Sequence, residues 1–82
     1  MKKNLKPTVL ITGSSRGIGA ATAKLLCKSG FEVILHGASR SDALITLSEK
    51  LNAKFLCFDV TKEEEIKKSL EGLEKLNILI NS

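Results

Sequence analysis

Short apolar runs alternate with amphipathic stretches along the whole chain. The apolar runs predict strands at residues 8–12, 31–36, 54–58 and 78–80. Between them, apolar residues recur at spacings of three and four, which predicts helices at residues 18–29, at residues 41–51 and after Thr61. The helix residues expected to face the core are Ile18, Thr22, Leu25 and Leu26, then Leu44, Leu47 and Leu51, then Ile66, Leu70 and Leu73.

This order of elements predicts a fold class. Connections of helical length join parallel strands, and right-handed crossovers then favour the spatial strand order 3-2-1-4. We expect an α/β fold, the N-terminal βαβαβαβ portion of a Rossmann-like, doubly wound parallel sheet. In such a sheet, ligands bind beyond the carboxyl ends of the strands, at the point where the strand order reverses.

Two signals mark helix ends. Gly30 follows the first helix at the position where a left-handed cap is common. Thr61 and Glu64 have the spacing of a capping box, in which the hydroxyl accepts a hydrogen bond from the first helical turn and the glutamate reaches back.

The segment between the first strand and the first helix is rich in glycine and reads Thr12-Gly13-Ser14-Ser15-Arg16-Gly17-Ile18-Gly19. Glycine has no Cβ, so the turn can be tight and a ligand can approach the backbone closely. The free amides and the positive end of the helix dipole then attract a phosphate. The sequence therefore predicts a nucleotide site that includes Gly13, Ser15, Arg16, Gly17, Ile18 and Gly19.

Composition narrows the classes of function. The 82 residues make one small domain at most and carry a net charge of +4. Ordinary solubility explains this charge, and attraction of a polyanionic cofactor is an alternative. Nucleic-acid binding is disfavoured, because the helical lysines alternate with glutamates and form no basic stripe. The first apolar run is too short for a secretory signal or a membrane span, so we expect a cytoplasmic protein without a membrane partner.

Three further residues were candidates for chemistry. Cys27 and Cys57 lie in apolar surroundings without the spacing of metal ligands, so we expect buried free thiols and no metal site. His36, near the end of a predicted strand, is expected to be a structural or rim histidine rather than a catalytic one.

The glycine-rich string, placed after a strand and before a helix, resembles that of the short-chain dehydrogenase/reductase family. Its Gly-Ser-Ser-Arg-Gly-Ile-Gly segment is similar to that of 3-oxoacyl-[acyl-carrier-protein] reductases. Asp59-Val60 stands where the family has an Asp that binds the adenine amino group, and Asn77-Ile78-Leu79-Ile80-Asn81 is similar to the family's Asp-Ile-Leu-Val-Asn. The resemblance implies that Asp59, Val60 and Asn81 contribute to the cofactor site. The chain departs from the family at Asn77, where Asp is usual, and at Ser82, where a second Asn is usual.

The resemblance also bears on the choice of cofactor. An acid at the end of the second strand would bond to the ribose 2′-OH of NAD and repel the 2′-phosphate of NADP, and the family pattern places that position at Gly37. In the family, a basic residue at the position of Arg16 accompanies NADP(H), and Ser39 and Arg40 follow the second strand. A guanidinium offers paired donors to a phosphate. We expect NADP(H), with NAD(H) less favoured; the alternative is that Arg16 and Arg40 are plain surface residues.

Hydride transfer in this family uses a Ser and a Tyr-x3-Lys pair, and the chain contains 0 Tyr. We therefore expect residues 1–82 to form an incomplete dinucleotide-binding domain that lacks the catalytic portion. The hypothesis is the NADP(H)-binding portion of a short-chain oxidoreductase that reduces a ketone or oxidises an alcohol, with 3-oxoacyl-[acyl-carrier-protein] as the best substrate guess. The alternative is a truncated, non-catalytic nucleotide-binding fragment. The partners implied at full length are a small carbonyl or acyl-carrier substrate and further copies of the protein.

Overall fold

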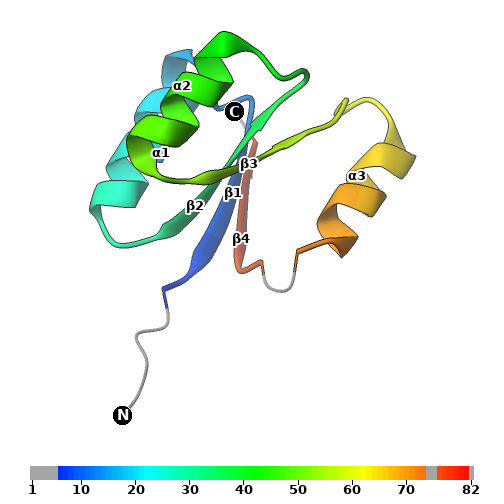
Figure 1. The fold of residues 1–82 in the computed structure, drawn as a ribbon. Coiled ribbons are helices and arrows are strands. Elements are labelled where there is room, and N and C mark those ends of the chain that lie inside the picture. The colour runs from blue at the N-terminus through cyan, green and yellow to red at the C-terminus, as the bar shows by residue number, and fades with distance from the viewer. Residues whose placement is uncertain (1–5, 74–75, 82) are drawn as a thin grey trace.

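A four-stranded parallel sheet forms the centre of the molecule. The computed structural model describes residues 6–73 and 76–81, so Ser82 and the first lysines lie outside the described residues. The sheet has the order β3-β2-β1-β4, which confirms the predicted 3-2-1-4 arrangement (Figure 1). Its strands are β1 (Thr8–Thr12), β2 (Glu32–Gly37), β3 (Lys54–Cys57) and β4 (Ile78–Asn81). The helices α1 (Gly17–Lys28) and α2 (Asp42–Leu51) cover one face, and α3 (Glu63–Glu71) lies on the other, as the Rossmann-like, doubly wound prediction requires.

Each face of the sheet packs its own apolar core, because side chains alternate along a strand. Val9, Ile11, Val33 and Leu35 face α1 and α2, where they meet Ala23, Leu44 and Leu47. On the opposite face, Leu10 and Ile34 pack with Phe58 and with the partly buried Ile66, Leu70 and Leu73. β1 is buried along its whole length, as expected for a central parallel strand covered on both faces. The predicted inward residues of α2 and α3 are thus confirmed.

The predicted inner face of α1 is wrong at Ile18 and Leu25, whereas Leu26 does pack against the core. Ile18 is 81% exposed and Leu25 is 63% exposed, whereas the buried residues are Gly19, Ala20 and Ala23. The helix meets the sheet through small residues, which let its backbone approach β1 and β2 closely. Ile18 and Leu25 therefore fall on the outer face.

One helix cap is confirmed and one is wrong. Gly30 has φ of +95°, so it does adopt the left-handed conformation that ends α1. α3, in contrast, has Lys62 at its N-cap and no side-chain cap. The Thr61 hydroxyl donates to Oδ1 of Asp59 instead, at 2.7 Å, and it is Glu65 that accepts from the Asp59 amide. An ionised carboxylate two residues away is the stronger partner for the hydroxyl.

The edges of the sheet leave some apolar groups open to solvent. Cys57 is exposed, which overturns the expectation of two buried thiols, because β3 is an edge strand of the sheet that the described residues form. Cys27 is half-buried. At the other edge, Ile78 and Leu79 of β4 are 39% and 49% exposed. Within residues 6–73 and 76–81, every helix is too short or too polar to cross a lipid bilayer.

Candidate functional site

The glycine-rich turn is fixed to the end of β2 by hydrogen bonds. The Gly13 amide donates to Nδ1 of His36 at 2.9 Å, and the Ser14 amide donates to the His36 carbonyl at 2.9 Å. Ser14 is fully buried, and its Oγ accepts from the His36 amide at 2.8 Å. Gly13 and Gly17 have φ of +62° and +67°, a left-handed backbone conformation that other residues rarely adopt.

The amino end of α1 has neither a side-chain cap nor an acidic residue in its first turn, whereas each of the other two helices has at least one of these. Its N-cap is Arg16, which makes no side-chain cap, and its first turn contains no acidic residue. Among the described residues, nothing accepts from the amides of Gly17, Ile18 and Gly19. α2 is instead capped by Ser41, and α3 carries three glutamates in its first turn. The turn therefore presents free amides and the positive end of a helix dipole together, which favours an anion.

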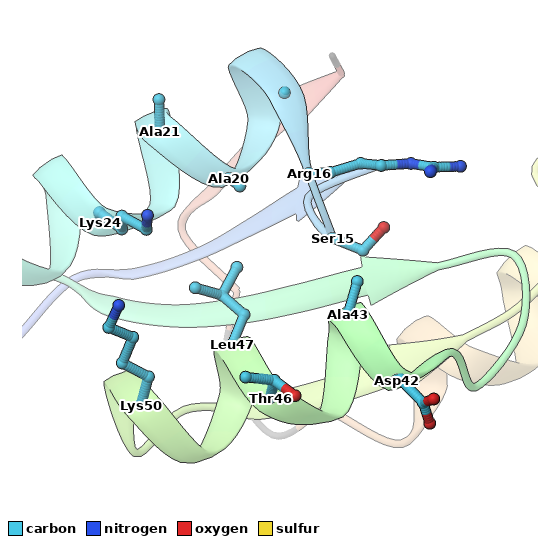
Figure 2. Close-up of a pocket in the computed structure, with 11 residues that line it drawn as sticks. Ser15, Arg16, Ala20, Ala21, Lys24, Asp42, Ala43, Thr46, Leu47 and Lys50 are labelled. Atoms are coloured by element: carbon cyan, nitrogen blue, oxygen red, sulfur yellow. The ribbon is translucent and has the colours of Figure 1, made fainter.

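A groove of about 740 Å³ runs from this turn between α1 and α2 (Figure 2). Ser15, Arg16 and Gly17 line its end at the turn, together with Asp42 from the first turn of α2. Lys24 and Lys50 lie at the other end of the groove (Figure 2). The groove thus carries three cationic side chains and one carboxylate. A cation next to free amides can hold a phosphate, whereas Asp42 opposes it.

The loop after β2 carries Gly37, Ser39 and Arg40. Gly37 is buried at the end of the strand, and a Cβ there would lie 3.1 Å from Cδ2 of Leu44. Ser39 is exposed and accepts from the Ser41 amide through its carbonyl. The Arg40 guanidinium lies 5.6 Å from the centre of the Phe55 ring on β3, within the range of a cation–π contact. Arg40 therefore lies over β3 and, unlike Arg16, does not line the groove.

Asp59 and Val60 follow β3 in an exposed loop. Oδ1 of Asp59 accepts from the Thr61 hydroxyl at 2.7 Å and from the Thr61 amide at 2.9 Å. These hydrogen bonds, with a smaller contribution from the Lys62 charge, hold the pKa of Asp59 below its ordinary value despite some desolvation. The carboxylate therefore stays ionised near neutral pH and can accept from an amino group.

Val60 and Asn81 come together on the α3 side of the sheet. Both line a hollow of about 260 Å³ whose walls are otherwise mostly apolar, with Leu10, Phe58 and Leu79 among them. Oδ1 of Asn81 accepts from the Thr12 hydroxyl at 3.1 Å, which ties the ends of β4 and β1 together. Asn77 stands where the family usually has Asp, and it still provides a hydrogen-bond acceptor. Its Oδ1 accepts from the Thr8 amide at 2.9 Å.

The residues predicted from the sequence do not all meet in one place. Ser15, Arg16 and Gly17 line the α1–α2 groove, Val60 and Asn81 line the second hollow, and Arg40 lies over Phe55 of β3. The remaining predicted residues line neither the groove nor the hollow, and they are Gly13, Ile18, Gly19, Ser39 and Asp59. Sequence reasoning missed Asp42, Lys24 and Lys50, which line the groove. Lys24 lies on α1 and the other two residues lie at opposite ends of α2, so they form no motif in the sequence. Only the packing of α1 beside α2 brings the three together.

Comparison with known proteins matches residues 7–82 of this chain to one family. The family model described as short chain dehydrogenase matches residues 7–82. A serine 3-dehydrogenase from Rhizobium radiobacter is 42% identical over 81 residues, which is 92% of this chain and 32% of that protein. A 3-oxoacyl-[acyl-carrier-protein] reductase from Aggregatibacter actinomycetemcomitans is 39% identical over 74% of this chain and 27% of its own length.

Solved structures give the same result. The structure of BdcA from E. coli matches with a TM-score of 0.80 and 32% identity, over 89% of this chain and 39% of that one. The chain spans about a third of the length of the curated relatives it matches, at 32% for the first two. From the matched residues and the shared fold, the chain belongs to the short-chain dehydrogenase family.

Proposed function

We propose that this chain is the NADP(H)-binding portion of a short-chain oxidoreductase that reduces a ketone or oxidises an alcohol. The observation that carries the proposal is the open amino end of α1, where the amides of Gly17, Ile18 and Gly19 have no acceptor among the described residues. No acidic residue stands in that first turn, and Arg16 lies next to it. A pyrophosphate fits this arrangement, since it supplies the acceptors that the amides lack.

Selectivity for the 2′-phosphate rests on the residues around the turn. Arg16 offers a fixed positive charge, and Ser39 and Arg40 follow β2 nearby in the sequence. Gly37 brings no acid to the position that would repel a 2′-phosphate, although crowding by Leu44 also explains the glycine there. The carboxylate of Asp42, which also lines the groove, repels the 2′-phosphate of NADP(H). We propose that the cation of Arg16 outweighs it, and that NADP(H) binds better than NAD(H).

The chain's own residues bind and orient the cofactor. The turn amides hold the pyrophosphate, Asp59 and Val60 meet the adenine side, and Asn81 stands at the end of β4 towards the rest of the cofactor. The nicotinamide ring, when bound, supplies the hydride chemistry. The proton that a carbonyl reduction needs does not come from a Tyr of this chain, which contains 0 Tyr.

Substrate and assembly are also part of the proposal. The relatives include a serine 3-dehydrogenase and a 3-oxoacyl-[acyl-carrier-protein] reductase, so a small hydroxy or carbonyl compound, free or on an acyl carrier, is the substrate class. We propose that the full-length protein assembles into a homo-oligomer. A second candidate is a nucleotide-binding module without catalysis, which the absence of Tyr in these residues favours.

Titration calorimetry with two half-cofactors tests the cofactor assignment. Adenosine 2′,5′-bisphosphate carries the 2′-phosphate of NADP, and 5′-AMP carries a free 2′-OH. Arg16→Ala should weaken the binding of adenosine 2′,5′-bisphosphate by about 1.5–3 kcal/mol, or about 10- to 150-fold, because one charge-assisted contact is lost. It should change 5′-AMP far less.

Asp42→Asn is the matched control, since it removes the opposing charge from the same groove. It should raise the affinity for the bisphosphate and leave the affinity for 5′-AMP nearly unchanged. An equal loss of both ligands in Arg16→Ala would show that this side chain does not read the 2′-phosphate. Reduction of a ketone by a longer protein that carries this chain separates the oxidoreductase from the non-catalytic module.

A further inference from the structure

His36 is the only histidine among the 82 residues, and both of its ring nitrogens are hydrogen-bonded inside the fold. His36 lies on β2 and is buried, with 3% of its surface exposed. Nδ1 accepts from the Gly13 amide at 2.9 Å, and Nε2 lies 2.8 Å from the Phe58 carbonyl. A carbonyl only accepts and an amide only donates, so the partners require a proton on Nε2 and none on Nδ1. The arrangement is satisfied by one neutral tautomer alone.

The backbone of His36 also forms hydrogen bonds to the glycine-rich turn. Its carbonyl accepts from the Ser14 amide at 2.9 Å, and its amide donates to Oγ of Ser14 at 2.8 Å. The imidazole also packs on the Phe58 ring, with 4.2 Å between the ring centres. One residue therefore ties the glycine-rich turn to β2 and to the loop that follows β3. That loop contains Asp59, and the turn leads into the free amides of α1.

We propose that His36 is a positioning residue for the phosphate-binding turn, and that protonation of its imidazole lowers nucleotide affinity. The proposal rests on the proposed function of the turn. A second ring proton on Nδ1 would face the Gly13 N–H, so two donors would oppose each other where a hydrogen bond stood. It would also place a charge on a buried ring. The turn or the ring must then move, and the amides of Gly17, Ile18 and Gly19 lose their alignment with the ligand.

The ionisable groups around the ring do not remove this conflict. The turn contributes Arg16, which is exposed, and β3 with its following loop contributes Cys57 and Asp59 on either side of Phe58. Among the described residues, none of these three side chains donates to or accepts from the imidazole. The Asp59 carboxylate is instead turned to Thr61. An imidazolium at position 36 would therefore gain no ion pair in exchange for the lost Gly13 hydrogen bond.

Nuclear magnetic resonance of the ring nitrogens provides the first test and needs no nucleotide. Because the chain has a single histidine, its ring signals are assigned without ambiguity. We expect the neutral ring to carry its proton on Nε2. The Gly13 amide signal should shift in step with ring protonation as the pH is lowered. A neutral ring protonated on Nδ1, or a Gly13 amide that ignores the titration, would overturn the proposal.

Calorimetric titration with adenosine 2′,5′-bisphosphate over the same pH range provides the second test. The ligand's own phosphates also titrate there, so the wild type is compared with His36→Asn. Asparagine Oδ1 can accept from the Gly13 amide at every pH. We expect the affinity of the wild type to fall about tenfold further than that of His36→Asn as the pH is lowered. His36→Leu, which offers no acceptor, should bind weakly at all pH values.

The outcomes separate this proposal from the function on which it rests. Identical pH profiles for the wild type and His36→Asn would overturn the role of His36 in binding. Absence of bisphosphate binding in every variant at every pH would overturn the nucleotide site. If the Gly13 amide still followed the ring titration in that case, the coupling of His36 to the turn would stand on its own.

Discussion

A side chain at position 37 should strain the fold before it alters the choice of nucleotide. A Cβ there would lie 3.1 Å from Cδ2 of Leu44 and 3.1 Å from the Ser39 carbonyl oxygen, both closer than the ordinary 3.4–4 Å contact. Leu44 is fully buried, so its side chain has little room to retreat. Gly37→Ala should therefore lower the free energy of unfolding by about 1–3 kcal/mol, the range for overpacked cores.

Leu44→Val is the matched partner for this substitution, because it removes a methylene group from the crowding side chain. Alone it should lower the free energy of unfolding by about 1 kcal/mol. Combined with Gly37→Ala it should restore part of the loss, since the contact with Cδ2 disappears while the Ser39 carbonyl remains. The coupling free energy between the two sites should be about 0.5–1.5 kcal/mol.

Urea unfolding of the four proteins, followed by circular dichroism, measures this cycle. The protein concentration is set where sedimentation velocity shows a monomer. Strict additivity of the two substitutions, or a Gly37→Ala variant as stable as the wild type, would refute the packing argument. The same cycle with Gly37→Asp then asks whether an acid at this position shifts preference from adenosine 2′,5′-bisphosphate to 5′-AMP. We expect that shift to be measurable only in the Leu44→Val background, where the acid can be accommodated.

Two further predictions concern the surfaces of the fold. Ala23→Leu should lower the free energy of unfolding by about 1–3 kcal/mol because Ala23 is fully buried against the sheet. Ile18→Ser should change it by no more than about 0.5 kcal/mol at an exposed site, and equal losses in urea unfolding at the two positions would contradict the observed face of α1. At the sheet edge, Leu79→Lys should reduce self-association of the 82-residue chain, since β4 presents half-exposed apolar side chains beside an open edge. Sedimentation equilibrium measures this, with Leu25→Lys as the control of equal charge, and an equal reduction by both would assign the effect to charge instead of the edge.

The strand order was predictable because it follows from connection lengths and handedness, which the sequence carries directly. Three helical connections between apolar runs leave few parallel topologies, and the order β3-β2-β1-β4 is one of them. The face of α1 was not predictable from apolar residues alone. Close approach to the sheet selects the small Gly19, Ala20 and Ala23. A rule that looks for large apolar side chains also selects Ile18 and Leu25, which are exposed.

The site was predictable only as far as it lies in one continuous segment. The turn from Gly13 to Gly19 has a motif, whereas Asp42, Lys24 and Lys50 reach the groove from separate turns of two helices. His36 was expected to be structural, and the structure places it inside the fold with both ring nitrogens bonded. Its link to Gly13 depends on a contact between residues 23 positions apart, for which the sequence offers no local signal.

The spacing of glycines in the turn separates two tasks that a single glycine could not perform. Gly13 takes a positive φ, and its amide donates a hydrogen bond to Nδ1 of His36. This amide therefore stabilises the fold and is not free to bind a ligand. Gly17 also takes a positive φ, but a Cβ there would meet, within 4 Å, no described atom beyond its chain neighbours and the backbone of its own helix. Its amide has no acceptor among the described residues. The left-handed backbone at Gly17 therefore brings no packing contact of its own. Its cost of about 1–2 kcal/mol for any other residue is explained if the open space and the free amides belong to a ligand.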